Sequence, residues 1–442
     1  MRNLRSVFDL RARPPALYPL ALLALLGGAL LWATRNAPIT LGPLRIDALA
    51  ALFALFSCGA PLLAALVGSG PTWRGLMIVL ALIAASLGPT PQINAWFLFL
   101  AALSGAGRGQ VQRSVASLVL LAAGGMLATR GVGDFAARVP PGALDANVFG
   151  VTLLGVLIGI FAPSEQGGSW RAARCIWLLP LLRLFSYGSW DLAWVTLAAS
   201  TGALAAAACG MHAWRTGTLQ AAWRILPCCG LAAAGAASSL GIAAVVAVLA
   251  ADGLGAALGR RAANHWVLLG APALAIWFTA GALLAGGAPA LLAPLLIGAA
   301  LAGVVMRVQA TDSPAPVWLV GLSLGWLVLA PLLLRIAAQP TVEQLQAGLS
   351  VYGELALVRR VGLVALDSAR REVLALPVLL IAALIGVLWA AIVLVRVVNA
   401  GAAQQAVRLH TPVTTNATTP APLFMRELRA RLPWLGGRDD RR

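Results

Sequence analysis

Apolar runs long enough to cross a lipid bilayer follow one another along most of this 442-residue chain. A straight transmembrane helix needs about 20 predominantly apolar residues. Inside the hydrocarbon region of a bilayer, each backbone N–H and C=O must find its hydrogen-bond partner within the protein, and a helix meets that demand locally. The sequence therefore predicts an all-α polytopic membrane protein.

The composition excludes the main soluble classes. Hydrophobic residues make up 60% of the chain and charged residues only 11%, whereas an ordinary globular domain carries about a quarter charged residues. A soluble fold could not bury that much apolar surface. The formal net charge of +17 would normally suggest a nucleic acid partner, but the arginines punctuate apolar runs, so contacts with loops and lipid headgroups explain them better. We expect membrane lipids as partners and no nucleic acid.

We expect about fourteen transmembrane helices. Their richness in Ala, Gly and Ser predicts a compact bundle, because small residues let helices approach closely. Some runs are shorter than a straight span requires, and we therefore predict two broken helices, with breaks near 163–171 and 270–275. The expected spans lie at about 16–33, 46–68, 73–88, 93–106, 114–130, 148–163, 172–187, 190–210, 220–239, 240–258, 265–286, 288–306, 316–337 and 373–398.

The flanking charges predict the orientation. Arg2, Arg5, Arg11 and Arg13 precede the first run, and no cleavage site follows it. Positive residues favour the cytoplasmic side, so we expect a cytoplasmic N-terminus in the inner (plasma) membrane, and an even number of spans returns the C-terminus there. The predicted organisation is a basic N-terminus at 1–15, a transmembrane bundle at 16–340, an amphipathic helix at 341–372, a final anchor at 373–398 and a polar, basic tail at 399–442.

The 341–372 segment is too charged to span a membrane and too apolar to be a simple loop. Amphipathic segments of this kind lie in the interface plane, so we predict a helix lying along the bundle. The alternative is a short extramembrane hairpin of helices.

Ionisable residues inside apolar runs are candidate functional residues. Asp252, Arg183 and Arg224 are the clearest, and Asp252 must be protonated, paired or hydrated. We expect Arg183 and Arg224, near span ends, to reach toward the interface. Asp47 and Asp191 open their spans and are expected to be helix N-caps. All 32 basic residues are arginines, whose side chains do not deprotonate in proteins.

The sequence offers no catalytic constellation and no cofactor motif. The five cysteines lack metal-ligand spacing, and no His lies near them at such a spacing. We therefore expect no catalytic residue, no metal and no cofactor bound by this chain alone.

Several apolar runs can be compared with known protein families through their order and spacing along the chain. Asp47 lies in ITLGPLRIDALAALFALFS, Pro163 ends GIFAP, and Arg183 lies in IWLLPLLRLFSYG. Pro272 lies in LLGAPALAIWFTAGALL, and Arg307 lies in LLIGAALAGVVMRV. Over about residues 40–310, this series resembles the antiporter-like membrane subunits of respiratory complex I, which are similar to Mrp-type cation/proton antiporters and membrane-bound hydrogenases. The 341–372 and 373–398 segments resemble the lateral helix and final anchor of the family's longest members.

The family's proton-carrying Glu and Lys residues have no counterpart here. The matching positions fall near Phe161, Cys175, Gln220 and Thr279 or Ala280, and INAWFLFLAALS contains no acid. The resemblance therefore implies a degenerate member: a non-conducting or weakly conducting subunit with a structural or assembly role in a larger proton- or cation-translocating redox membrane complex. Its partners would be other integral membrane subunits of an NADH-quinone oxidoreductase-like or hydrogenase-like assembly.

Two alternatives remain open at the level of sequence. A stand-alone secondary transporter for a neutral or anionic solute would use Arg183 and Arg224 to meet an anion. A lipid-linked glycan polymerase or transferase would need a large extramembrane loop, and the longest interior loop, at about 131–147, is short for that chemistry.

Overall fold

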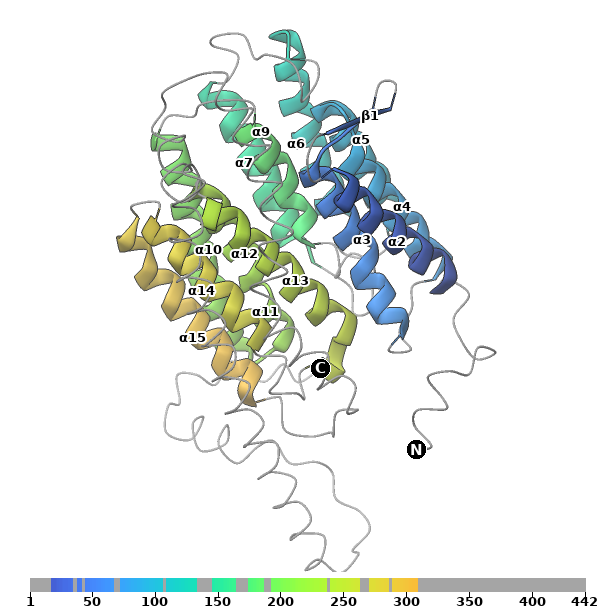
Figure 1. Ribbon diagram of the computed structural model, residues 1–442. Helices are drawn as coiled ribbons and strands as arrows, with labels where there is room; N and C mark the ends of the chain where they lie inside the picture. The colour runs from blue at the N-terminus through green and yellow to red at the C-terminus, as the bar shows by residue number, and fades with distance from the viewer. Residues whose placement is uncertain are drawn as a thin grey trace, which may run out of the picture.

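In the computed structural model, the chain forms a bundle of closely packed helices (Figure 1). The structure describes residues 17–34, 38–41, 44–66, 72–105, 109–132, 145–163, 174–186, 192–236, 239–262, 270–285 and 288–308. The expected spans 316–337 and 373–398, the amphipathic segment 341–372 and both tails lie outside these residues. The number of about fourteen transmembrane helices therefore stays a prediction.

Each expected span between 16 and 308 corresponds to a helix or a pair of helices. The helices are α2 (Leu17–Ala33), α3 (Ala48–Leu66), α4 (Trp73–Leu87), α5 (Pro91–Ser104), α6 (Gln110–Thr129), α7 (Ala146–Phe161), η2 (Arg174–Leu178), α9 (Leu179–Ser186), α10 (Leu192–Thr216), α11 (Leu219–Trp223), α12 (Ile225–Gly235), α13 (Ser239–Ala262), α14 (Gly270–Ala285), η4 (Pro289–Leu291) and α15 (Leu292–Val308). Within the described ranges, four segments are both long and apolar enough to cross a membrane: Ala48–Ala65, Gln110–Thr129, Ala193–Thr216 and Pro289–Met306.

A short antiparallel hairpin precedes α3. Strand β1 (Ile39–Leu41) pairs with β2 (Leu44–Ile46), so that Ile39 lies opposite Ile46. The all-α prediction did not include this hairpin. Its strands include the β-branched residues Ile39, Thr40 and Ile46, which favour strand geometry, and the hairpin is too short to be a membrane span.

Two groups of helices flank a central element. Helices α2–α6 lie on one side and α10–α15 on the other, with α7 and α9 between them, while α13 packs against α3 and joins the groups (Figure 1). The central element consists of η2 and α9, residues Arg174–Ser186, and we call it the central segment. It is too short to span a bilayer, as expected for the broken-helix region after 163.

The second break differs from the prediction. Helix α14 runs without interruption across 270–275, because Pro272 occupies its first turn, where a missing N–H removes no helical hydrogen bond. The interruption in this half of the chain lies instead at Arg224, which ends α11 and begins α12.

Small residues bring the helices of the second group into backbone contact, as predicted. A Cβ added to Gly202 on α10 would lie 2.3 Å from the backbone nitrogen of Ala232 on α12. A Cβ added to Gly210 would lie 2.2 Å from the carbonyl oxygen of Gly298 on α15. Any side chain at these two positions would force the helices apart. The close packing of the helices therefore requires glycine there.

Candidate functional site

The central segment is buried between the two groups of helices. Trp177, Leu178, Leu179 and Leu181 are each at most 1% exposed. Trp177 packs onto α7 at Gly159, where an added Cβ would lie 2.2 Å from the indole ring. Leu178 packs onto α12 at Gly230, where an added Cβ would lie 2.5 Å from its Cδ1. The segment therefore fits between the two groups, with a glycine opposite each of these two side chains.

The Arg174 end of the segment holds a fully buried ion pair. Arg174 Nη2 lies 2.7 Å from Asp252 Oδ1 on α13, and the side chains are 5% and 1% exposed. The Cys175 thiol donates to Asp252 Oδ2 at 3.5 Å. Of the three states considered for Asp252 from the sequence, the structure shows the paired one. Removing one partner of such a pair costs about 3–5 kcal/mol, because it leaves the other charge buried and uncompensated.

Within the described residues, this end also carries buried donors that Asp252 does not satisfy. Arg174 Nε and Nη1 are buried and have no hydrogen-bond partner in the described part of the chain, and the same is true of Trp223 Nε1. Arg224, half-buried at the α11–α12 break, lies close enough to Arg174 for the two charges to repel. Two arginines therefore lie near each other at this end, and one of them, Arg174, is paired with Asp252.

The Arg183 end holds a second pair of different geometry. Arg183 binds Asp47 through two hydrogen bonds, Nη1 to Oδ2 and Nη2 to Oδ1, the latter at 2.8 Å. Asp47 also accepts from the Ala50 N–H at 2.8 Å, so it caps α3 as predicted. Arg183 lies in the last turn of α9, where a cation also favours the helix dipole.

Arg183 does not reach toward the interface as expected from its place near a span end. It is only 3% exposed, because Asp47 from a helix distant in sequence supplies a buried acceptor. Asp191, the other expected cap, lies outside the described residues.

The remaining family-like positions lie in helices or at helix ends. The Pro163 carbonyl accepts a hydrogen bond from Arg113 Nη1 at 2.8 Å, which ties the end of α7 to α6. Pro272 lies in the first turn of α14, and Arg307 lies in the last turn of α15. Thr279 is buried and donates to the Ala275 carbonyl of its own helix, at 2.9 Å. None of these contacts joins the central ion pairs.

Arg174 was missed by the sequence reading. It lies near the start of the expected span 172–187, and no local pattern distinguishes it from the other arginines. The one available signal was the isolated acid Asp252, for which a paired state was one of three possibilities, but its sequence context did not identify the partner.

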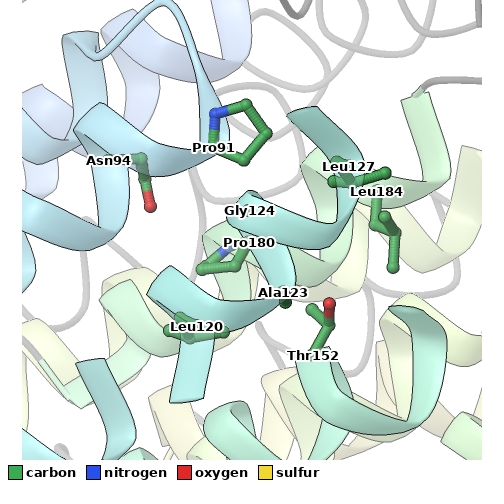
Figure 2. A pocket seen from close by; sticks show the side chains of 9 residues that line it. All are labelled: Pro91, Asn94, Leu120, Ala123, Gly124, Leu127, Thr152, Pro180 and Leu184. Atoms are coloured by element: carbon green, nitrogen blue, oxygen red, sulfur yellow. The ribbon is translucent and has the colours of Figure 1, made fainter. Parts of the chain in front are cut away.

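A small cavity adjoins the central segment. It has a volume of about 20 Å³, lies between α5, α6, α7 and α9, and is lined by Asn94, Leu120, Thr152 and Leu184 among others (Figure 2). Asn94 donates to the Ala85 carbonyl at 2.6 Å, and Thr152 donates to the Val148 carbonyl at 2.8 Å. The space is sufficient for about one water molecule.

A third ion pair lies at the ends of two helices. Arg130, after α6, lies 2.6 Å from Asp145, which caps α7 by accepting from the Val148 N–H at 3.0 Å. The hydrogen bond from Arg130, followed by that from Val148, lowers the pKa of Asp145 to about 2. Both side chains are partly exposed, so this pair belongs to the loop end of the bundle.

These features describe a polytopic membrane protein with a short central segment. An arginine–aspartate ion pair holds each end of that segment. The fold of the protein is similar to that of a chain in the Mrp complex from Dietzia sp. DQ12-45-1b, with a TM-score of 0.58 and 16% sequence identity. The alignment covers 95% of this chain and 59% of the Dietzia chain, so this chain corresponds to about three fifths of that protein's length.

A chain of respiratory complex I from Thermus thermophilus, with bound aureothin, aligns over 78% of this chain and 94% of its own length. The identity is 16% and the TM-score 0.46, which is too low to establish a common fold. No protein-family model and no curated protein matches the sequence. The similarity to the Dietzia chain is one of fold, and it agrees with the resemblance inferred from the sequence.

Proposed function

We propose that this chain is a non-conducting or weakly conducting antiporter-like subunit, with a structural or assembly role in a larger proton- or cation-translocating redox membrane complex. Two observations support the proposal. The fold is similar to that of a chain from an Mrp complex. The central carboxylates, Asp47 and Asp252, are each paired with an arginine.

The pairing of the central carboxylates carries most of the argument. A group that relays protons must take up and release them at accessible pH, and arginine does not deprotonate in proteins. Protonation of Asp252 would leave the charge of Arg174 buried without a partner, which costs several kcal/mol. The same reasoning applies to Asp47 and Arg183. Charges held in such pairs stay fixed and hold helices together. This supports a structural role for the two carboxylates over a proton-carrying one.

A structural role also needs a surface for neighbours. Helix α2 exposes Leu25 at 73% and Trp32 at 63%, and α4 exposes Trp73 at 71% and Met77 at 58%. Side chains of this kind face lipid or sister subunits in a membrane. The proposal includes the cytoplasmic N-terminus, the inner membrane and the 341–372 helix as a contact with a neighbour.

Purification of the chain with its neighbours tests the assembly role. We would tag the C-terminal tail, extract the protein in a mild detergent and identify co-purifying chains by mass spectrometry. Recovery of other integral membrane subunits of an ion-translocating or redox complex is the expected result. A monodisperse protein with no partner would contradict the proposal and favour a stand-alone transporter.

Reconstitution of the purified chain into liposomes tests conduction. With a pH-sensitive dye inside the vesicles and an imposed pH gradient, we expect a proton flux close to that of empty liposomes. A flux that is well above this level and is abolished by Asp252→Asn would overturn the non-conducting role. Asp145→Asn is the matched control, since Asp145 lies outside the central segment.

A further inference from the structure

Two cysteines from different helices lie sulfur to sulfur. Cys209 on α10 and Cys228 in the first turn of α12 have Sγ atoms 3.8 Å apart. Both are free thiols and are 5% and 1% exposed. A disulfide has a bond length of about 2.05 Å, so the two sulfurs would have to approach by roughly 1.8 Å to form one.

The two helices that carry these cysteines pack closely against each other. Helices α10 and α12 are antiparallel, and a Cβ added to Gly235 would lie 2.2 Å from the Ala199 nitrogen. One helical turn further along, Gly202 meets Ala232 in the same way. Cys209 and Cys228 lie further along the same antiparallel helix pair, seven residues after Gly202 and four residues before Ala232. Their sulfur atoms already lie 3.8 Å apart, so only a small movement separates the dithiol from a disulfide.

The surroundings of the pair are electropositive. Arg224, next to α12, and Arg174, on the central segment, both act electrostatically on Cys209. Arg174 is paired with Asp252, whereas Arg224 forms no salt bridge within the described part of the chain. Nearby cations stabilise a thiolate, which is the reactive form in disulfide chemistry. Cys229 follows Cys228 directly and is also buried, but it has no comparable sulfur contact among the described residues.

We propose that Cys209 and Cys228 form a redox-sensitive dithiol that closes to an intramolecular disulfide between α10 and α12. Two S–H bonds break and one S–S bond forms. The two electrons and two protons pass to a lipid-soluble two-electron oxidant of the azo or quinone class, which becomes a hydrazine or a hydroquinone. The bond fixes the start of α12 against α10 and with it the break at Arg224. This inference is independent of the proposed function.

Counting thiols on the full chain tests the proposal. The protein in mild detergent is reduced, freed of reductant, treated with the azo compound diamide, quenched with acid and unfolded in detergent before labelling with a maleimide. Untreated protein should take up five labels, one for each cysteine. Treated protein should take up three, and peptide mass spectrometry should find Cys209 linked to Cys228. Reduction should restore five labels.

Single serine variants assign the bond. Cys229→Ser is the matched control, because Cys229 is a buried neighbour in the same helix, and it should still lose two labels on oxidation. Cys209→Ser and Cys228→Ser should each keep all four of their labels. Five labels on the treated wild-type protein would overturn the proposal, and so would a linkage that involves Cys229 or Cys175.

Discussion

The two ends of the central segment are each held by an arginine and an aspartate, yet the two pairs differ in burial and in balance. At the Arg183 end, Asp47 is 22% exposed, binds the guanidinium through both oxygens and also caps α3. At the Arg174 end, Asp252 is 1% exposed, binds Arg174 and accepts from the Cys175 thiol, while a second arginine, Arg224, lies near Arg174.

The difference indicates separate roles. The Arg183 end has matched charges and a carboxylate that serves a local helix start, so it resembles a structural joint between α3 and α9. Among the described residues, the Arg174 end has buried donors without acceptors, and Arg174 and Arg224 both act electrostatically on Cys209. Any chemistry in the described bundle is therefore expected at the Arg174 end.

Loss of the Asp252 carboxylate should have the largest effect. Asp252→Ala leaves Arg174 buried without its anion, and we expect destabilisation of about 3–5 kcal/mol. The measurement is the unfolding midpoint of the detergent-solubilised protein, followed by tryptophan fluorescence. The double variant Arg174→Leu/Asp252→Leu removes both charges and should recover much of the loss. An Asp252→Ala midpoint equal to that of the wild type would show that the pair contributes nothing.

Loss of the Asp47 carboxylate should cost less. Asp47→Ala removes a helix cap, worth about 1 kcal/mol, and also the partner of Arg183, but water reaches this end more easily. Asp47→Asn keeps an acceptor for the Ala50 N–H and removes only the charge, so the difference between the two variants isolates the cap. If Asp47→Ala were more harmful than Asp252→Ala in the same assay, the assigned order of the two ends would be wrong.

The fit of Trp177 against α7 can be tested without changing any charge. In Gly159→Ala the new methyl would lie 2.2 Å from the indole, and overpacking of this kind costs about 1–3 kcal/mol. Gly150→Ala is the matched control on the same helix, because an added Cβ there has no heavy atom within 4 Å. The Gly150 variant should equal or exceed the wild type in unfolding midpoint, whereas the Gly159 variant should unfold at a lower temperature.

The loop-end pair gives the smallest effect and depends on pH. The pKa of Asp145 is lowered to about 2 in the folded protein and is about 3.9 in an unfolded chain. Its contribution is therefore complete above about pH 4 and is lost as the pH falls toward 2. Between these values the unfolding midpoint of Asp145→Asn should fall less steeply with pH than that of the wild type. Parallel slopes would show that this exposed pair contributes no measurable stability.

The expected spans between 16 and 308 follow the observed helices closely, and the Asp47 cap was also foreseen. Both depend on signals within a few residues of each other: runs of apolar side chains and an acid at a helix start. The break at Arg224 and the hairpin at Ile39–Ile46 were not foreseen. In both places the local sequence is compatible with more than one backbone conformation, and packing against other elements selects the one observed.

The sequence by itself determined that this is a membrane protein of closely packed helices. Hydrophobicity and side-chain size are properties of each residue, so they can be read without knowing which helices touch. Only the tertiary structure decided which charges meet. Arg174 and Asp252 are 78 residues apart in the chain, and Arg183 and Asp47 are 136 apart. A buried carboxylate requires a cationic partner, but with 32 arginines available the choice rests on which helices lie side by side.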